Sequence, residues 1–129
     1  NKLYYSGLGD GTIYEYDLGS GKSESIYKSD NDTGYFYITF DGNYIWMDDE
    51  GYKNMAMYFN KQSSSLDYTL YQLDRDGKLA AKRIIPDEEK IFSIMHGDSR
   101  RMFMFSFVNN KIVYIDKSNI EKGDIKELR

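Results

Sequence analysis

The sequence contains no cysteine, one proline and one histidine among its 129 residues. The absence of cysteine excludes disulfides, thiolate nucleophiles and cysteine-ligated zinc sites together. With a single histidine, His96, the sequence indicates neither a two-histidine metal site nor a serine–histidine–aspartate triad. We therefore expect His96 to be a polar residue in a turn rather than a catalytic group.

Long apolar runs and an excess of one charge are also missing. No apolar run approaches the 18 residues that suggest a membrane-spanning helix. The 21 acidic and 17 basic residues give a net charge of −4 and are scattered along the chain, without a basic stripe for a phosphate backbone. The sequence thus indicates no membrane span, no nucleic-acid partner and no cofactor.

Aromatic residues, in contrast, are abundant. The chain has 13 Tyr, 7 Phe and 1 Trp, and side chains of this kind fit the half-buried surface of a β-sheet. The length favours one domain, residues 1–129.

A repeated motif organises the chain. Lys2–Asp17 and Arg101–Asp116 align without a gap, 99 residues apart, and a third copy of the motif ends at Asp74. The three motif aspartates, Asp17, Asp74 and Asp116, are separated by 57 and 42 residues. An aspartate at a strand end accepts backbone N–H bonds, so we expect these acids to fix turns rather than to form a site.

The longer spacing has a definite origin. The extra 15 residues fall within Asp49–Tyr68, and without them the period is 42 throughout. A second gapless pair, Tyr35–Asn43 and Phe92–Arg100, places Asp41 opposite Asp98 in a polar turn after a strand. A period of about 40–45 residues that contains only strand patterns is typical of propeller blades.

The sequence therefore predicts an all-β fold of β-propeller-type repeats, with about two and three-quarter four-stranded blades in a partial ring. The blades are residues 1–30 (partial), 31–87 and 88–129. The expected strands are Leu3–Ser6, Thr12–Asp17 and Glu24–Tyr27; Tyr35–Phe40, Tyr44–Asp48, Thr69–Asp74 and Leu79–Ile85; and Ile91–Met95, Met102–Phe107, Lys111–Asp116 and Asp124–Leu128.

Two segments are ambiguous. Pro86 is followed by three acids, as at a helix start, but the alignment of Phe92–Arg100 with a strand favours a loop between blades and then an innermost strand. Met102–Phe107 lacks clean alternation of polar and apolar residues, so we expect it to be buried on both faces between stacked sheets.

The segments "TIYEYDLGSGK" (Thr12–Lys22), "TLYQLDRDGK" (Thr69–Lys78) and "KIVYIDKSN" (Lys111–Asn119) resemble the bacterial β-propeller families built on YVTN-, YWTD- or TolB-type blades. Those families include surface-exposed lipoproteins and binding modules. The resemblance implies a non-catalytic binding or protein-interaction module of a larger bacterial surface or secreted protein, in an extracytoplasmic location.

We expect candidate ligand-binding residues mainly in the inserted stretch Asp49–Tyr68, because ligand-binding sites often lie on long loops of a rigid scaffold. They are Tyr52, Tyr58 and Phe59, together with Trp46. A carbohydrate-binding propeller would use such aromatic platforms for a glycan, and a protein ligand is the other option. The insertion could equally extend its hairpin and pack on its own blade.

Acidic residues offer weaker candidates. Asp30 and Asp32 alternate as in the first half of a calcium loop, but the third acid and the distant Glu are missing, which favours a solvated loop. A fragment of a propeller-fold glycoside hydrolase would need two carboxylates across a cleft. Asp48, Asp49 and Glu50 are candidates whose adjacency says nothing of that separation.

The predicted ring is incomplete, since propellers usually have four to eight blades. The innermost strand of the first unit would precede Lys2. We expect either a fragment of a longer chain or self-association through apolar faces of the terminal blades, with Leu3–Ser6 or Asp124–Leu128 as edges for strand pairing.

Overall fold

The computed structural model describes residues 1–6, 11–29, 37–49, 60, 68–86, 91–106 and 109–129. Helical structure within these ranges is confined to a 3-10 turn, η2 (Lys117–Asn119). The strands of the described residues are β1 (Lys2–Ser6), β2 (Thr12–Asp17), β3 (Lys22–Lys28), β4 (Ile38–Phe40), β5 (Ile45–Asp49), β6 (Tyr68–Leu73), β7 (Leu79–Ile85), β8 (Ile91–Gly97), β9 (Arg101–Ser106), β10 (Lys111–Asp116) and β11 (Lys126–Glu127).

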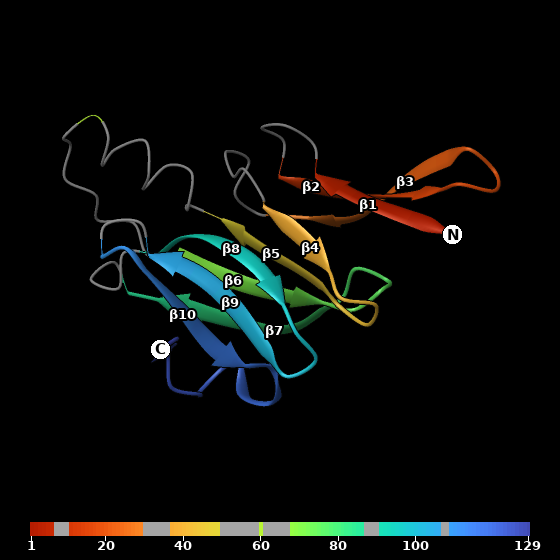
Figure 1. The fold of residues 1–129 in the computed structure, drawn as a ribbon. Helices are drawn as coiled ribbons and strands as arrows, with labels where there is room; N and C mark the ends of the chain where they lie inside the picture. Colours follow the sequence, from red (N-terminus) through yellow and green to blue (C-terminus); the bar gives the residue numbers. More distant parts are fainter. Residues whose placement is uncertain (7–10, 30–36, 50–59, 61–67, 87–90, 107–108) are drawn as a thin grey trace.

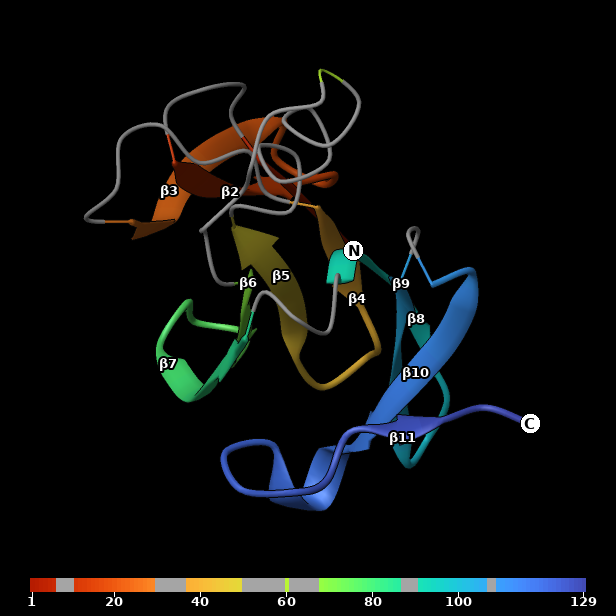
Figure 2. The same ribbon diagram turned by 90° about the vertical axis from the view of Figure 1, so that its left-hand side faces the viewer.

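The strands form three antiparallel sheets, which do not close into a ring (Figures 1 and 2). The first sheet has the order β1-β2-β3, the second β4-β5-β6-β7 and the third β11-β10-β9-β8. The all-β class is confirmed, and the strands group as three, four and four, as the repeat predicts. Beyond Pro86, the predicted strand is confirmed as β8, an edge strand of the third sheet, whereas residues 87–90 lie outside the described residues.

The second sheet lies between the other two and is buried on both faces. Toward the first sheet, Ile45, Met47 and Leu73 pack with Ile13 of β2. Toward the third sheet, its side chains join a larger core cluster. That cluster contains Trp46, Tyr68, Leu70 and Ile85 of the second sheet and Met102, Met104, Val113, Ile115 and Ile120 of the third sheet or the turn that follows it.

Strand β5 shows the consequence of this position most directly. Its consecutive residues Ile45, Trp46, Met47 and Asp48 are all 0% exposed. Successive side chains of a strand point to opposite faces, so a strand covered on both faces reads as a continuous apolar run.

Strand β9 differs from this pattern. The prediction that both faces of Met102–Phe107 are buried is wrong for residues 102–106, and Phe107 lies outside the described residues. Met102, Met104 and Ser106 are buried, whereas the alternating Phe103 and Phe105 are only half-buried. The third sheet ends the described stack, and no other described sheet covers its outer face. An apolar sequence therefore does not distinguish a strand inside the stack from one at its end.

Residues that are equivalent in the repeat face the same way in all three sheets. Ile45 faces the first sheet and Met102 faces the second, so each lies on the side of the sheet that precedes it in the chain. Their counterpart in the first sheet is Leu3, which is 52% exposed. The first sheet has no predecessor among the described sheets, and its corresponding face is therefore open.

The opposite faces obey the same rule. Trp46 packs toward the third sheet, and its counterpart Tyr4 packs toward the second. The counterpart in the last sheet, Phe103, lies on the outer face and is half-buried. Position in the repeat thus determines which neighbouring sheet a side chain meets.

The first and second sheets approach closely at Gly77, in the turn after β6. Gly77 has φ 84°, and a Cβ atom at this position would lie 2.1 Å from the carbonyl oxygen of Ile26 in β3. Only glycine suits both the backbone conformation and this spacing.

Leu70→Ala is expected to lower the free energy of unfolding by about 2–5 kcal/mol, because it opens a cavity in the cluster between the second and third sheets. The matched control is Leu79→Ala in β7, where the side chain is 50% exposed. This control should change stability by less than about 1 kcal/mol. Urea denaturation followed by tryptophan fluorescence measures both, and equal losses would contradict the assigned core.

Candidate functional site

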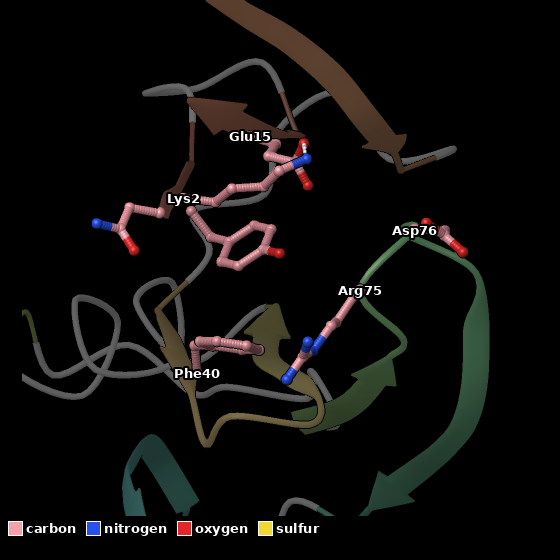
Figure 3. Close-up of a pocket in the computed structure, with 7 residues that line it drawn as sticks. Lys2, Glu15, Phe40, Arg75 and Asp76 are labelled. Atoms are coloured by element: carbon pink, nitrogen blue, oxygen red, sulfur yellow. Dashed lines mark hydrogen bonds and ion pairs between the residues drawn. The ribbon is translucent and has the colours of Figure 1, made fainter. Parts of the chain in front are cut away.

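A cavity of about 460 Å³ opens between the first and second sheets (Figure 3). Its lining comes from β1 and β2 on one side and from two turns or strand ends of the second sheet on the other. The lining residues are Asn1, Lys2, Tyr4, Glu15, Phe40, Arg75 and Asp76. Both charged side chains and aromatic rings therefore line the cavity.

An ion pair forms the wall from the first sheet. The Nζ of Lys2 donates to Oε1 of Glu15 at 2.6 Å, and Glu15 is only 7% exposed. The hydrogen bond to Glu15 raises the pKa of Lys2. Burial, together with the nearby charge of Glu15, raises the pKa of Tyr4. The pair thus neutralises the two charges that the first sheet supplies.

Phe40 and Arg75 form the opposite wall. The Tyr4 and Phe40 rings lie 4.9 Å apart between centroids, across the boundary of the two sheets. The Arg75 guanidinium lies 5.8 Å from the centroid of Phe40 and donates a hydrogen bond to the carbonyl oxygen of Gly42. Figure 3 shows this side chain extending along the cavity toward Phe40. Among the described residues Arg75 makes no ion pair, so its charge is not matched by a carboxylate.

The boundary between the second and third sheets holds a related cluster, in which a carboxylate pairs with the cation. Lys117 Nζ lies 2.8 Å from Asp41 Oδ2 and 5.5 Å from the centroid of the Trp46 ring. Trp46 Nε1 also donates to Asp41 Oδ2, at 2.8 Å. Lys117 additionally donates to the carbonyl oxygen of Asp98. The Asp41 carboxylate therefore binds both the Lys117 ammonium and the Trp46 indole, which come from different sheets.

Hydrogen bonding controls the charge state of Asp41. Burial alone would raise its pKa, but bonds from Lys117, the backbone N–H of Tyr44, Trp46 and the backbone N–H of Asn43 outweigh burial. Together they hold the pKa of Asp41 well below its usual range. Asp41 is accordingly an ionised group at neutral pH.

The two boundaries correspond to each other position by position. Arg75 and Lys117 each follow a motif aspartate, Asp74 or Asp116, and Tyr4 takes the place of Trp46. The repeat alignment places no residue of the described first sheet opposite Asp41. The cavity is thus a sheet boundary with its cation and its aromatic ring, but no described residue supplies a carboxylate at the position of Asp41.

The motif aspartates hold turns, which confirms the prediction for them. Asp17 Oδ1 accepts from Gly19 N and Ser20 N at 2.8 and 3.0 Å. Asp74 and Asp116 accept in the same way from the residues after them. Backbone hydrogen bonds lower the pKa of Asp17 and, together with the Ser118 hydroxyl, that of Asp116. These carboxylates are occupied locally and do not converge.

The turn before β9 carries a similar local arrangement. Asp98 accepts two hydrogen bonds from the guanidinium of Arg101, which together with backbone N–H donors lowers the pKa of Asp98 to about 2. A second cavity of about 390 Å³ lies here, lined by Asp98, Arg100, Arg101, Tyr114, Asp116 and Lys126. Its Arg101 is already paired, unlike Arg75.

Of the candidate ligand-binding residues, the structure describes Trp46 alone, and it is 0% exposed within the core. Tyr52, Tyr58 and Phe59 lie outside the described residues, as do the weak metal candidates Asp30 and Asp32. The remaining candidates therefore stay predictions.

The other polar candidates lie apart from the cavity. Asp48 is 0% exposed and accepts a hydrogen bond from the hydroxyl of Tyr68 at 2.7 Å. His96 lies in strand β8, so the prediction that it belongs to a turn is wrong. It is exposed, with Nδ1 3.1 Å from Thr39 Oγ1, and no carboxylate of the described residues contacts it. Within the described ranges no three acidic or histidine side chains are grouped to hold a metal.

Comparisons with known proteins give no assignment: neither a protein-family model nor a curated protein sequence matches this chain. In the described part of the chain, no helix has the length and apolar character needed to cross a membrane.

Sequence reasoning missed Arg75, Lys117 and the Lys2–Glu15 pair. One signal was available, since a basic residue follows the motif aspartate in both the second and third units. Its meaning depends on the stacking of sheets, which brings Lys117 to Asp41 across 76 residues.

Asp41→Asn is expected to destabilise the fold at pH 7 by about 1–3 kcal/mol, because Lys117 and Trp46 lose a charged acceptor. The folded-state pKa of Asp41 is depressed, so its contribution is full above pH 4 and is lost as pH falls below that. The variant should therefore approach the wild type in stability near pH 2.

Thermal unfolding at several pH values tests this, with exposed Asp124→Asn as the control for removing one acid. A constant difference between Asp41→Asn and the wild type from pH 7 to pH 2 would show that the ionised carboxylate is not responsible.

Proposed function

We propose that this chain is a non-catalytic protein-interaction module made of propeller-type blades, part of a larger bacterial surface or secreted assembly. One observation carries the proposal. The outer faces of the first and third sheets present apolar and aromatic side chains at the repeat positions that are buried between sheets elsewhere in the chain. The resemblance of the repeat to bacterial surface propellers supports the extracytoplasmic location.

The outer face of the first sheet is rich in tyrosine. Leu3 is 52% exposed and pairs with Tyr16, and Tyr5 is 42% exposed and pairs with Tyr14. The Tyr5 and Tyr14 rings stack with their centroids 5.1 Å apart. The equivalent positions of the third sheet hold Met102, Met104, Val113 and Ile115, which are all buried against the second sheet.

The outer face of the third sheet carries the complementary set of positions. Phe103 pairs with Tyr114, and their rings lie 6.1 Å apart. The Arg101 guanidinium lies 5.0 Å from the Phe103 ring and 5.4 Å from the Tyr114 ring. Ile112 extends the same face. The counterparts of Phe103 and Ile112 in the second sheet are Trp46 and Leu70, which pack against the next sheet.

These equivalences favour a second copy of the chain as the occupant of both faces. The contact that would form, third sheet of one copy on first sheet of the other, repeats a pairing that the chain already makes twice. The described residues of each copy form eleven strands, so two copies supply 22 such strands, or five and a half four-stranded blades. That total lies within the usual range of four to eight blades. Such a contact is head-to-tail rather than symmetric.

A carbohydrate-binding module is the second candidate. Exposed Tyr5, stacked on Tyr14 and hydrogen-bonded through its hydroxyl to Ser23 Oγ at 2.6 Å, offers a rigid aromatic platform. Aromatic rings with a polar end favour amphipathic ligands.

Self-association is expected to depend on both outer faces. Phe103→Glu or Tyr5→Glu should each reduce the association seen by sedimentation velocity, because each places a charge on one apolar face. Ile84→Glu is the matched control, since Ile84 is 55% exposed on β7 and belongs to neither face.

Mixing the two variants gives a sharper test of the head-to-tail arrangement. Phe103→Glu keeps an intact first sheet and Tyr5→Glu an intact third sheet, so the mixture should form one contact and yield dimers. Strictly monomeric wild-type protein at high concentration, or no dimer in the mixture, would overturn the docking of copies.

A glycan array distinguishes the second candidate. If Tyr5 is a sugar platform, the wild type binds at least one glycan class and Tyr5→Ala loses that binding by tenfold or more, in line with about 1.4 kcal/mol. Phe103→Ala serves as the control on the opposite face. Absence of any glycan bound above background would rule this candidate out.

A further inference from the structure

The outer edge of β1 differs from the corresponding edges in the other two sheets. In the second sheet β5 pairs with β4, and in the third sheet β9 pairs with β8. By the repeat alignment β1 is the counterpart of β5 and β9, yet it is the edge strand of its sheet, and no described strand pairs with its outer edge. An open strand edge is a template for pairing with another segment.

The direction of the backbone groups in β1 can be deduced from its pairing with β2. Leu18 N donates to the carbonyl oxygen of Asn1, so Asn1 bonds toward β2. Neighbouring residues of an antiparallel strand bond toward opposite sides, and Lys2 and Tyr4 therefore direct their N–H and C=O groups to the outer edge. Tyr44, the counterpart of Lys2, directly precedes β5, and its carbonyl oxygen accepts in this way from Asp41 N.

The cavity with Arg75 lies beside the same edge, because Lys2 and Tyr4 also line it. At the equivalent place in the next boundary, the acid of the β4–β5 turn reaches the cation that follows β10, with Asp41 Oδ2 and Lys117 Nζ 2.8 Å apart. In the cavity, Lys2 is paired with Glu15, and Arg75 is the cation that the described residues leave without a carboxylate. Among the described residues, this edge has no pairing strand, and the cavity has no acid at the position equivalent to Asp41.

We propose that the β1 edge and the Arg75 cavity together form one binding site for an extended peptide strand that pairs antiparallel with β1 and carries an aspartate just after its last paired residue. The strand supplies backbone hydrogen bonds to Lys2 and Tyr4, and its aspartate meets the Arg75 guanidinium beside Phe40. Strand addition of this kind gives affinity through the main chain and specificity through side-chain pockets.

The chain itself indicates which peptide to use as a probe. The segment "YFYITFDG" (residues 35–42) contains β4, carries Asp41 directly after that strand and leads toward β5. In the repeat alignment the next residue, Asn43, corresponds to Asn1, so a peptide of residues 35–42 stops where Asn1 begins and carries the aspartate at the spacing that the site requires. Its neutral form, with Asp41→Asn in the peptide only, removes the carboxylate and keeps the shape.

The site is separate from the two outer faces, although its proposal rests on the proposed function of the chain as an interaction module. Binding is therefore measured on the Phe103→Glu variant, in which association of copies is suppressed. Failure of face docking and failure of peptide binding are then distinguishable.

Titration of the peptide into ¹⁵N-labelled protein is expected to shift the amide signals of Lys2 and Tyr4 in NMR spectra. The neutral peptide should bind about tenfold more weakly, since a charge-assisted hydrogen bond is lost. Arg75→Ala should cause a similar loss with the acidic peptide and little further loss with the neutral one, because both changes remove one interaction. Lys122→Ala, an exposed cation elsewhere, should bind as the parent does.

Joining "YFYITFDG" directly to Asn1 provides a second measurement that does not depend on the affinity of a free peptide. This extension should raise the melting temperature, and the increase should be smaller with asparagine in place of the aspartate or with Arg75→Ala. Absence of shifts in β1 together with no gain in melting temperature would overturn the site. Equal effects of the acidic and neutral sequences would overturn the role of Arg75.

Discussion

Burial of the second sheet on both faces is the constraint on which the rest of the structure depends. Its three consecutive apolar residues Ile45, Trp46 and Met47 cannot all be covered unless a sheet packs on each side. Full burial of such a side chain contributes about 1.5–3 kcal/mol. Apolar packing therefore holds the stack together, and charged contacts such as Asp41–Lys117 select its register.

Local chemistry explains why so much of the strand order could be predicted from the sequence. Each turn aspartate is satisfied by backbone N–H groups within four residues, so the turns after Asp17, Asp74 and Asp116 do not need the rest of the fold. Strand ends were less predictable. The last strand was expected over Asp124–Leu128 and covers only Lys126–Glu127, because it is an edge strand with two paired residues.

The cavity and the related cluster at Asp41 could not be predicted in the same way, because they are made by sheets rather than by segments. The contact of Arg75 with Phe40 and that of Lys117 with Asp41 exist only once neighbouring sheets are stacked. Trp46 illustrates the same difficulty. As the single tryptophan next to an insertion it was a reasonable ligand residue, yet alternation along β5 directs it into the core and toward the Asp41 carboxylate.

The consistent orientation of equivalent residues also bears on how such a chain can change over evolution. Each unit carries one face suited to its predecessor and one suited to its successor, as Ile45 and Trp46 show for adjacent positions of a single strand. A tandem duplication of the segment that forms one whole sheet would therefore meet compatible surfaces on both sides without compensating mutations. An insertion or deletion of a single residue within β5 would instead exchange its two faces. Chains of this design can gain or lose length most easily in whole units.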